Sequence, residues 1–386
     1  MSRADDDDTG EAGIEERRMS GADDDDPGQA GIEERRMSGA ESRLLQTIQV
    51  QGQVCAGMGS SMYGDVLQQV AADVEADGVF AAILAGHEND SGRLALPLRL
   101  LGGLHRLVLD GRAPALRRWY PSVGGHWDTE AGWPDVVRAA SEHADYLRGA
   151  LDQPPQTNEV GRSAALIGGL LALVDRFEAP VRLFEIGCSA GLNLRADHYR
   201  YRQPGGDWGP ADSPVTVDDA WRGPPPPAAG LAIAERHGYD IAPLDATSSD
   251  GELTLLSYVW PDQPARLERL RGAIGIARRV PAPLHLRNAT DAVADLEVSP
   301  GSLTVLWHSI MWQYLSVTEQ ETVSAEIDEL GARARAESPF AHLMLEPHRR
   351  TPDAPVEFAV RARCWPGEDD RLLGVCSPHG PPVTWE

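Results

Sequence analysis

The sequence lacks any uninterrupted apolar run of the roughly 20 residues that a membrane-spanning helix needs. Hydrophobic residues make up 42% of its 386 residues, which is close to the share in ordinary globular proteins. The chain opens with aspartates instead of a basic region and an apolar stretch, so it does not resemble a secretory signal peptide. We therefore expect a cytoplasmic protein that makes no use of a membrane.

Cysteine is scarce, and basic residues are outnumbered. The four cysteines are scattered without a Cys-x-x-Cys pair, which argues against a disulfide framework and against a zinc site, so no metal is expected. The sequence holds 35 basic and 59 acidic residues, a net charge of −24. Because nucleic-acid backbones require a basic face, this balance argues against nucleic acid as a partner. Composition leaves the oligomeric state open.

Residues 1–42 form an acidic tandem repeat with a period of 18 residues. The unit from Ala4 to Gly21 recurs from Ala22 to Gly39 with two substitutions. Two polar, glycine-bearing units cannot bury a core, so we predict that this segment is disordered. A recent duplication explains the repeat more simply than an acidic interaction tail.

Residues 43–178 show helical periodicity, with apolar side chains three or four positions apart, as at Val66 and Val70. No strand pattern appears before residue 181. We therefore predict a helical cap domain over 43–178, followed by a second domain over 179–386.

The second domain opens with the most informative stretch of the chain. Residues 181–186 form an apolar run typical of a buried parallel strand. Gly187 and Gly191 follow, and then 192–199 has the pattern of a helix start. A strand, a glycine turn and a helix allow a backbone to approach a ligand at the helix N-terminus.

This turn is compatible with two enzyme classes. Gly187-Cys188-Ser189-Ala190-Gly191 matches Gly-x-Ser-x-Gly, the nucleophile elbow of α/β-hydrolases, in which Ser189 would be the nucleophile. In an α/β-hydrolase, however, several strands precede the elbow. Since no strand is predicted upstream of this turn, the pattern favours the other interpretation, in which the turn binds a cofactor.

Downstream of the turn, strand and helix patterns alternate, as in a parallel sheet covered on both faces. Residues 200–230 are rich in glycine, proline and tryptophan, and we expect an exposed connection there. The elements predicted next are a short helix at 231–237, a strand end at 238–243, a helix at 263–279, a strand from 283 with a polar turn and a helix to 296, a strand at 302–308, a helix at 318–336 and a strand at 340–345. Residues 356–365 and 371–375 are predicted to form an antiparallel hairpin that closes the sheet edge.

Several of these segments resemble the Rossmann-like methyltransferases that use S-adenosylmethionine. Glu185, Gly187 and Gly191 match the pattern Glu-x-Gly-x-x-x-Gly of their first motif. In that motif the turn holds the methionine part of the cofactor, and Ser189 would be a small residue within it.

The same resemblance implies further cofactor contacts. Asp240, in Gly-Tyr-Asp-Ile-Ala-Pro, is similar to the second-strand acid that holds the ribose hydroxyls. Asp291, in Asn-Ala-Thr-Asp, is similar to the acidic turn beside the adenine. Trp307 lies in a segment similar to the fourth-strand motif that lines the methyl-transfer site.

From residue 44 to 386 the chain also resembles one bacterial, largely actinobacterial family, known as domain of unknown function 2332. The resemblance is carried by Tyr-Pro-Ser-Val-Gly-Gly at 120–125, Gln-Thr-Asn-Glu-Val-Gly-Arg at 156–162, the turn itself, Ser-Tyr-Val-Trp-Pro-Asp-Gln at 257–263, His-Ser-Ile-Met-Trp-Gln-Tyr-Leu at 308–315 and Gly-Pro-Pro at 380–382. This resemblance implies no reaction.

Together, these features predict an α/β fold: a Rossmann-like, mostly parallel sheet with an antiparallel C-terminal hairpin, preceded by helices. The expected function is methyl transfer from S-adenosylmethionine to an oxygen or nitrogen of a small molecule. His308, which follows a strand, is our candidate for the general base, with Asp262 as the alternative. Two other hypotheses stay open, namely a serine hydrolase and a methyltransferase-like protein that binds a nucleotide or partner without turnover.

Overall fold

The computed structural model describes residues 38–386 except for 91–94, 153–154, 225, 228–229 and 368. Most of the predicted acidic tail therefore lies outside the described residues. Its last residues, from Gly39, belong to the first helix. The chain from Gly39 to Glu386 forms one compact unit.

The described residues before 181 contain helices and no strand, as their periodicity predicts. The apolar stripes of these helices are buried, for example at Val66 and Leu100. In chain order the helices are α1 (Gly39–Gly57), α2 (Ser61–Glu75), α3 (Val79–Leu84), α4 (Leu96–Leu109), the 3₁₀ turns η2 (Pro114–Trp119) and η3 (Pro121–Val123), α5 (Thr129–Glu142), α6 (Ala144–Leu151), the 3₁₀ turn η4 (Val160–Arg162) and α7 (Ser163–Phe177).

From residue 181 onward the described chain builds a nine-stranded sheet in the order β4-β11-β10-β9-β8-β7-β1-β5-β6. The strands β6, β5, β1, β7 and β8 run parallel to one another, and β8, β9, β10 and β11 pair antiparallel. The bounds are β1 (Val181–Ile186), β4 (Trp221–Arg222), β5 (Ile233–Asp240), β6 (Leu284–Leu286), β7 (Leu303–Ser309), β8 (Phe340–His348), β9 (Glu357–Trp365), β10 (Asp369–Ser377) and β11 (Gly380–Trp385). The predicted mixed sheet, largely parallel with an antiparallel C-terminal part, is confirmed.

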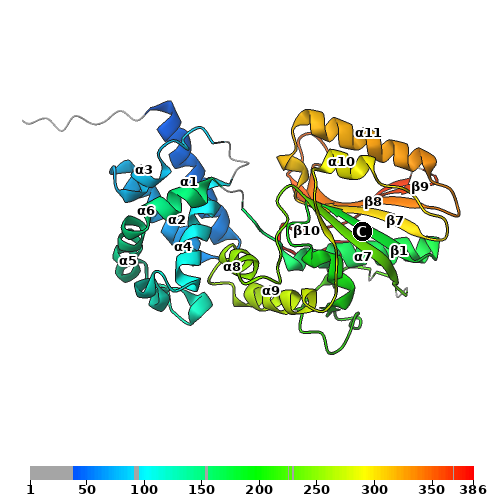
Figure 1. The fold of residues 1–386 in the computed structure, drawn as a ribbon, viewed down its shortest axis with the longest axis horizontal. Helices are drawn as coiled ribbons and strands as arrows, with labels where there is room; N and C mark the ends of the chain where they lie inside the picture. The colour runs from blue at the N-terminus through cyan, green and yellow to red at the C-terminus, as the bar shows by residue number, and fades with distance from the viewer. Residues whose placement is uncertain (1–37, 91–94, 153–154, 225, 228–229, 368) are drawn as a thin grey trace, which may run out of the picture. The chain divides into compact units, whose positions relative to one another are not determined.

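Helices cover both faces of this sheet (Figure 1). Alternate side chains of β1, such as Leu183, pack with α7, while Phe184 packs with α10 (Ala289–Ala294) and α11 (Val317–Arg333). The remaining elements are the 3₁₀ segments η5 (Leu192–His198) and η6 (Trp312–Tyr314), the two-residue pair β2 (Arg200–Tyr201) and β3 (Thr216–Val217), and the helices α8 (Ser249–Ser257) and α9 (Pro264–Ala277).

The prediction of a short helix at 231–237 is wrong, because β5 begins at Ile233. This stretch has good helix formers, but β1 pairs with it from Ile233 onward and takes up its backbone hydrogen bonds, while β6 pairs only with Gly238–Asp240. Sheet pairing thus overrides the local propensity. The predicted helix at 192–199 is a 3₁₀ segment with a break at Arg195, whose φ and ψ are −108° and 20°.

Two further predictions fail in the region that completes the sheet. Residues 200–230 are not merely an exposed connection, because Tyr201 and Trp221 are buried and β4 joins the sheet. The hairpin of β9 and β10 does not close the edge either. Instead β11 pairs with β10 on one side and with β4 on the other.

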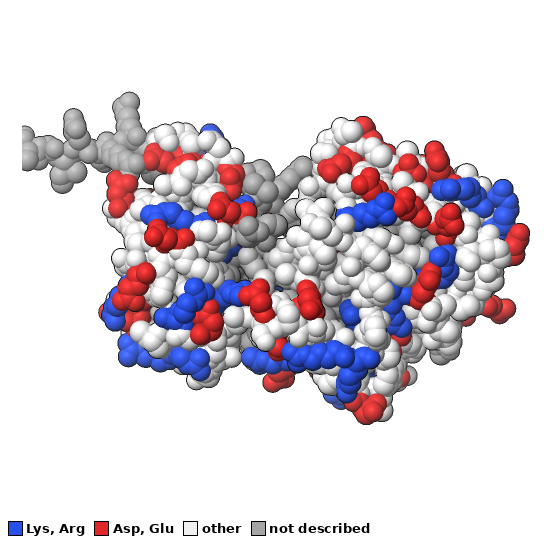
Figure 2. Space-filling view, in the orientation of Figure 1, with Lys and Arg blue, Asp and Glu red and all other residues white. Residues whose placement is uncertain are grey.

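Charges of both signs are interspersed over the face of the molecule shown in Figure 2. Many of the arginines pair with a nearby acid, as Arg350 does with Glu357 at 2.7 Å. Among the described residues, no helix has the length and apolar content to cross a bilayer. All four cysteines are free thiols, as predicted.

Candidate functional site

The parallel part of the sheet reverses its strand order between β1 and β7. From β1 the chain continues to the neighbour β5 and then to β6, and it afterwards crosses to the other side of β1 to form β7 and β8. In open α/β sheets, ligands bind outside the carboxyl ends of the strands at such a switch point. The predicted glycine turn directly follows β1 and therefore lies at this position.

The turn itself has a left-handed backbone. The φ angles are +66° at Gly187, +51° at Ser189 and +61° at Gly191. Such angles are natural for glycine but strained for serine. Asp240, at the end of β5, holds the turn in place, because its Oδ2 accepts a hydrogen bond from the Ser189 N–H at 2.8 Å. Asp240 thus lies beside the turn, as the sequence predicts for an acid of the second strand.

A segment that precedes α7 in the chain packs over the turn. The Gln156 Oε1 accepts a hydrogen bond from Ser189 Oγ at 3.1 Å, and the Asn158 Oδ1 accepts one from the Leu192 N–H at 2.7 Å. Leu192 is the first residue of η5, so Asn158 occupies the amide that a ligand at this helix start would otherwise use. No described imidazole is hydrogen-bonded to Ser189, whose hydroxyl instead donates to Gln156.

Met311, which follows β7, covers Gly187 from the other side. A Cβ atom on Gly187 would lie only 2.8 Å from Met311 Cβ and 2.9 Å from its Cγ. Ile310, the residue before it, has a φ of +50°, which is strained for a β-branched side chain. The segment after β7 is therefore bent so that the methionine fills the space above the turn.

Glu185 and Trp307 form a buried polar pair beneath the turn. They lie opposite each other in register on β1 and β7 and are 2% and 0% exposed. Neither Glu185 Oε2 nor Trp307 Nε1 has a hydrogen-bond partner among the described residues. Burial raises the pKa of Glu185 to about 8, and the neighbouring indole opposes this rise only in part. An uncompensated carboxyl group of this kind is typical of functional sites.

His308 lies on the opposite face of the sheet from Glu185. Its Nδ1 is 2.8 Å from Glu346 Oε1, and its Nε2 is 2.9 Å from His342 Nε2. Burial lowers the pKa of His342 well below its ordinary value, so this ring is neutral. Both bonds form if His308 donates to Glu346 and accepts from His342, which leaves His342 Nδ1 and Glu346 Oε2 without a partner among the described residues. Both nitrogens of the predicted base are then engaged within the protein.

The two remaining acids predicted for the site have hydrogen-bond partners outside the turn. Asp262 accepts hydrogen bonds from Ser60 Oγ at 2.6 Å and from the Met62 N–H at 3.1 Å, at the start of α2. Asp291 is exposed on the first turn of α10, where its Oδ2 is 3.1 Å from the Asn288 amide. The structure therefore brings together Glu185, Gly187, Ser189, Gly191, Asp240 and Trp307, and it separates them from Asp262.

A cavity of about 670 Å³ adjoins the turn through Gln156. Its walls come from α4, α6 and α8 and from residues 242–244, which follow β5. Sequence patterns do not reveal this cavity, because helices far apart in the chain build it. A sequence signal for this region is Gln156, which opens the Gln-Thr-Asn-Glu-Val-Gly-Arg motif at 156–162, before α7.

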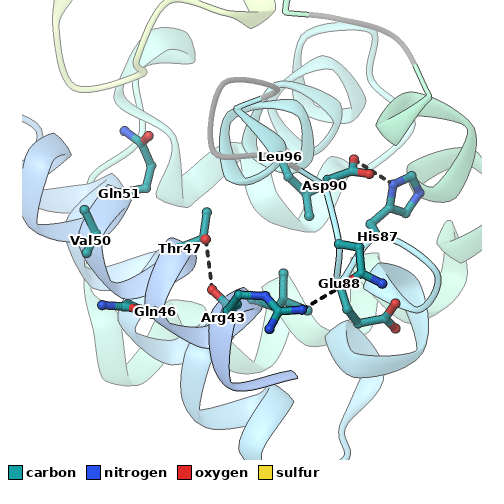
Figure 3. Close-up of a pocket in the computed structure, with 11 residues that line it drawn as sticks. Arg43, Gln46, Thr47, Val50, Gln51, His87, Glu88, Asp90 and Leu96 are labelled. Atoms are coloured by element: carbon teal, nitrogen blue, oxygen red, sulfur yellow. Dashed lines mark hydrogen bonds and ion pairs between the residues drawn. The ribbon is translucent and has the colours of Figure 1, made fainter. Parts of the chain in front are cut away.

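Another cavity, of about 500 Å³, lies between α1 and residues 87–90 (Figure 3). Arg43 of α1 donates to Asn89 Oδ1 at 2.9 Å, and His87 Nδ1 lies 3.1 Å from Asp90 Oδ2. None of the predicted site residues lines this cavity. It is therefore separate from the candidate site.

A family model described as "Uncharacterized protein conserved in bacteria (DUF2332)" matches residues 46–385. The match covers most of the chain, so the protein belongs to this family. The resemblance to the domain of unknown function 2332 is thereby confirmed. No curated protein matches the chain. The family description names no reaction, and the function must therefore be argued from the site.

Proposed function

We propose that this member of the DUF2332 family transfers a methyl group from S-adenosylmethionine to an oxygen or nitrogen atom of a small molecule in the cytoplasm. The observation that carries the proposal is the position of the turn. Its positive-φ glycines follow β1 at the switch point of a parallel sheet, and Asp240 lies at the end of the adjacent strand β5.

The residues around the turn fit this cofactor chemically. Glu185 has a buried oxygen without a partner in the part of the chain that the structure describes, which suits the ammonium group or sulfonium charge of the cofactor. Asp240 accepts backbone hydrogen bonds from Ser189 and Ala242, yet a carboxylate offers about four acceptor sites and can also take ribose hydroxyls. Met311 occupies the space above Gly187, but methionine is unbranched and adaptable and can be displaced.

When bound, the cofactor would supply the activated methyl group, and the protein would position the acceptor and exclude water. His308 could serve as a base only after its bond to His342 opens, and Asp262 is engaged at the start of α2. We therefore propose that the protein acts by aligning the acceptor with the methyl group of the cofactor. This role suits an acceptor that is nucleophilic enough to react without a base from the protein.

Calorimetric titration with S-adenosylmethionine and S-adenosylhomocysteine tests the cofactor directly. We expect both to bind the wild type, and a ligand at 100 times its Kd stabilises the fold by about 2.7 kcal/mol. Gly187→Val should abolish binding, because the side chain would fill the space that the ligand needs. The matched control is Gly301→Val, since Gly301 also has a positive φ of +78° but has open space around it.

Two further variants keep the test decisive if Gly187→Val does not fold. Asp240→Ala should weaken binding, whereas Met311→Ala should preserve or strengthen it by clearing the space above the turn. The proposal fails if the folded wild type binds neither ligand, or if binding survives Gly187→Val unchanged. Binding without formation of S-adenosylhomocysteine from any hydroxyl or amino acceptor would support the non-catalytic alternative.

A further inference from the structure

The cavity beside Gln156 has the size of a site for a small molecule. Its volume of about 670 Å³ lies within the range of roughly 300–1,000 Å³ that ligand pockets occupy. Gln156 connects it to the turn, because its Oε1 accepts the Ser189 hydroxyl while its amide nitrogen has no partner among the described residues. A molecule in this cavity that accepts from the Gln156 amide is thus linked to the turn through a single side chain.

The charged side chains that line this cavity are all neutralised. Arg106 is ion-paired with Asp250 and also donates to Thr254 Oγ1 at 2.5 Å. Arg112 is paired with Asp110 at 2.6 Å.

The fourth charged lining residue, Asp145, is paired with Arg148 at 2.7 Å. A charged ligand would therefore enter without a free counter-charge and would lose hydration without compensation. The cavity thus favours an uncharged molecule.

The shape and composition of the walls favour a flat molecule. Gly149 exposes helix backbone, whereas Gly102 is buried under the Tyr258 ring, where a Cβ atom would lie 2.8 Å from the ring's Cε1. Tyr146 lies opposite the Arg112 guanidinium, 4.0 Å from ring centroid to Cζ. Aromatic ligands gain from offset or edge-on contact with such rings, and glycine leaves room for a ring to approach the backbone.

We propose that this cavity binds an uncharged aromatic molecule bearing a hydroxyl group, which is held between Tyr146 and Tyr258 with its oxygen toward Gln156. Its role as the methyl acceptor rests on the proposed function, whereas its binding does not. An aromatic hydroxyl loses its proton far more readily than an alcohol, which suits a site whose histidine is engaged with protein partners. In the transfer, the oxygen lone pair would form the new O–CH₃ bond, the sulfur–methyl bond would break with its electron pair on sulfur, and the hydroxyl proton would pass to water.

The test is a titration of 2-naphthol into the full-length protein without cofactor. Two compounds of the same size serve as ligand controls: 2-naphthoate carries a charge, and 2-decalol lacks aromatic rings. We expect 2-naphthol to bind saturably, with a Kd about tenfold or more below that of either control. This corresponds to about 1.4 kcal/mol or more in binding free energy.

Gly149→Phe is the variant that fills the cavity. A Cβ atom on Gly149 meets no atom within 4 Å, so the ring has space to enter without distorting α6. Gly275→Phe in α9 is the matched control, since Gly275 is also a helical glycine with open space and does not line the cavity. We expect Gly149→Phe to weaken 2-naphthol binding about tenfold or more and Gly275→Phe to leave the Kd within about twofold.

Gln156→Leu provides a second variant, which removes the amide donor at nearly constant volume and should also weaken binding. The proposal is overturned if 2-naphthol does not saturate, if 2-naphthoate or 2-decalol binds as well, or if neither Gly149→Phe nor Gln156→Leu weakens binding. These outcomes are independent of the cofactor test. Failure of S-adenosylmethionine to bind would remove the proposed function while leaving a measured 2-naphthol site in place.

Discussion

Glu185 should make the protein less stable as the pH rises, and Glu185→Gln should remove that loss. The pKa of this carboxyl is about 8 in the folded state against an ordinary value of 4.5. Between these values the folded state holds a proton that the unfolded state has released, so the free energy of unfolding falls with rising pH. At 1.36 kcal/mol for each pH unit, the full window of 4.5 to 8 corresponds to roughly 5 kcal/mol.

Calorimetric melting at pH 5 and pH 8 measures this effect. At about 2.1 cal/mol/K per residue, 5 kcal/mol corresponds to roughly 7 °C in the Tm of a unit of this size. Glu185→Gln keeps the shape of the side chain but cannot ionise. Between pH 5 and pH 8, which span only part of the full window, the wild type should therefore lose roughly 3.5 kcal/mol, or about 5 °C in Tm, relative to the variant. Glu329→Gln, on an exposed position of α11, is the control and should follow the wild type.

The same Tm difference between wild type and Glu185→Gln at both pH values would refute this reasoning. It would mean that groups in the folded protein stabilise the ionised Glu185 carboxylate about as well as water does in the unfolded chain. A titration with S-adenosylmethionine extends the test. At pH 7 the binding of a cationic ligand beside Glu185 should release a proton, which appears as a dependence of the measured heat on the buffer.

Three further predictions concern other buried groups. Burial lowers the pKa of His105 to about 4 from 6.5, so the unfolded state takes up a proton first as the pH falls. The free energy of unfolding should then drop by roughly 3 kcal/mol between those values, and His105→Asn should remove that pH dependence in acid melting curves. Glu159→Gln removes the carboxylate that pairs with the Arg266 guanidinium, a group that is largely shielded from solvent, and should cost about 3–5 kcal/mol in urea unfolding, with much of the loss recovered by adding Arg266→Met; additive losses in the double variant would contradict this. Ser189 should not react with a fluorophosphonate probe, and stoichiometric labelling that disappears in Ser189→Ala would establish the hydrolase alternative.

Local patterns predicted the parts of the fold that short segments determine. The run from Val181, the glycines of the turn and the strand at Leu303 carry their own signals in hydrophobicity and backbone requirement. The start of β5 could not be predicted in this way. Its residues favour a helix by propensity and become a strand because β1 pairs with them.

The site was predicted at the level of its turn but not of its surroundings. Asp240 lies beside the turn that follows Glu185, because the carboxyl ends of adjacent parallel strands lie at one edge of a sheet, while its role toward a cofactor stays a prediction. The contact of Met311 with Gly187 and the bond between Asn158 and Leu192 join residues that are far apart in the chain. Such contacts depend on tertiary packing, which no local pattern contains.

The pairing of Trp221 with Val383 constrains the order in which the chain can fold. Val383 belongs to β11, which separates β4 from β10, so β4 has no partner strand until β11, more than 150 residues later in the chain, has been synthesised. Trp385 closes against α7, where its ring leaves no room for a side chain at Gly168. Until then this part of α7 has an apolar face without its cover, which is the condition that makes nascent chains depend on chaperones.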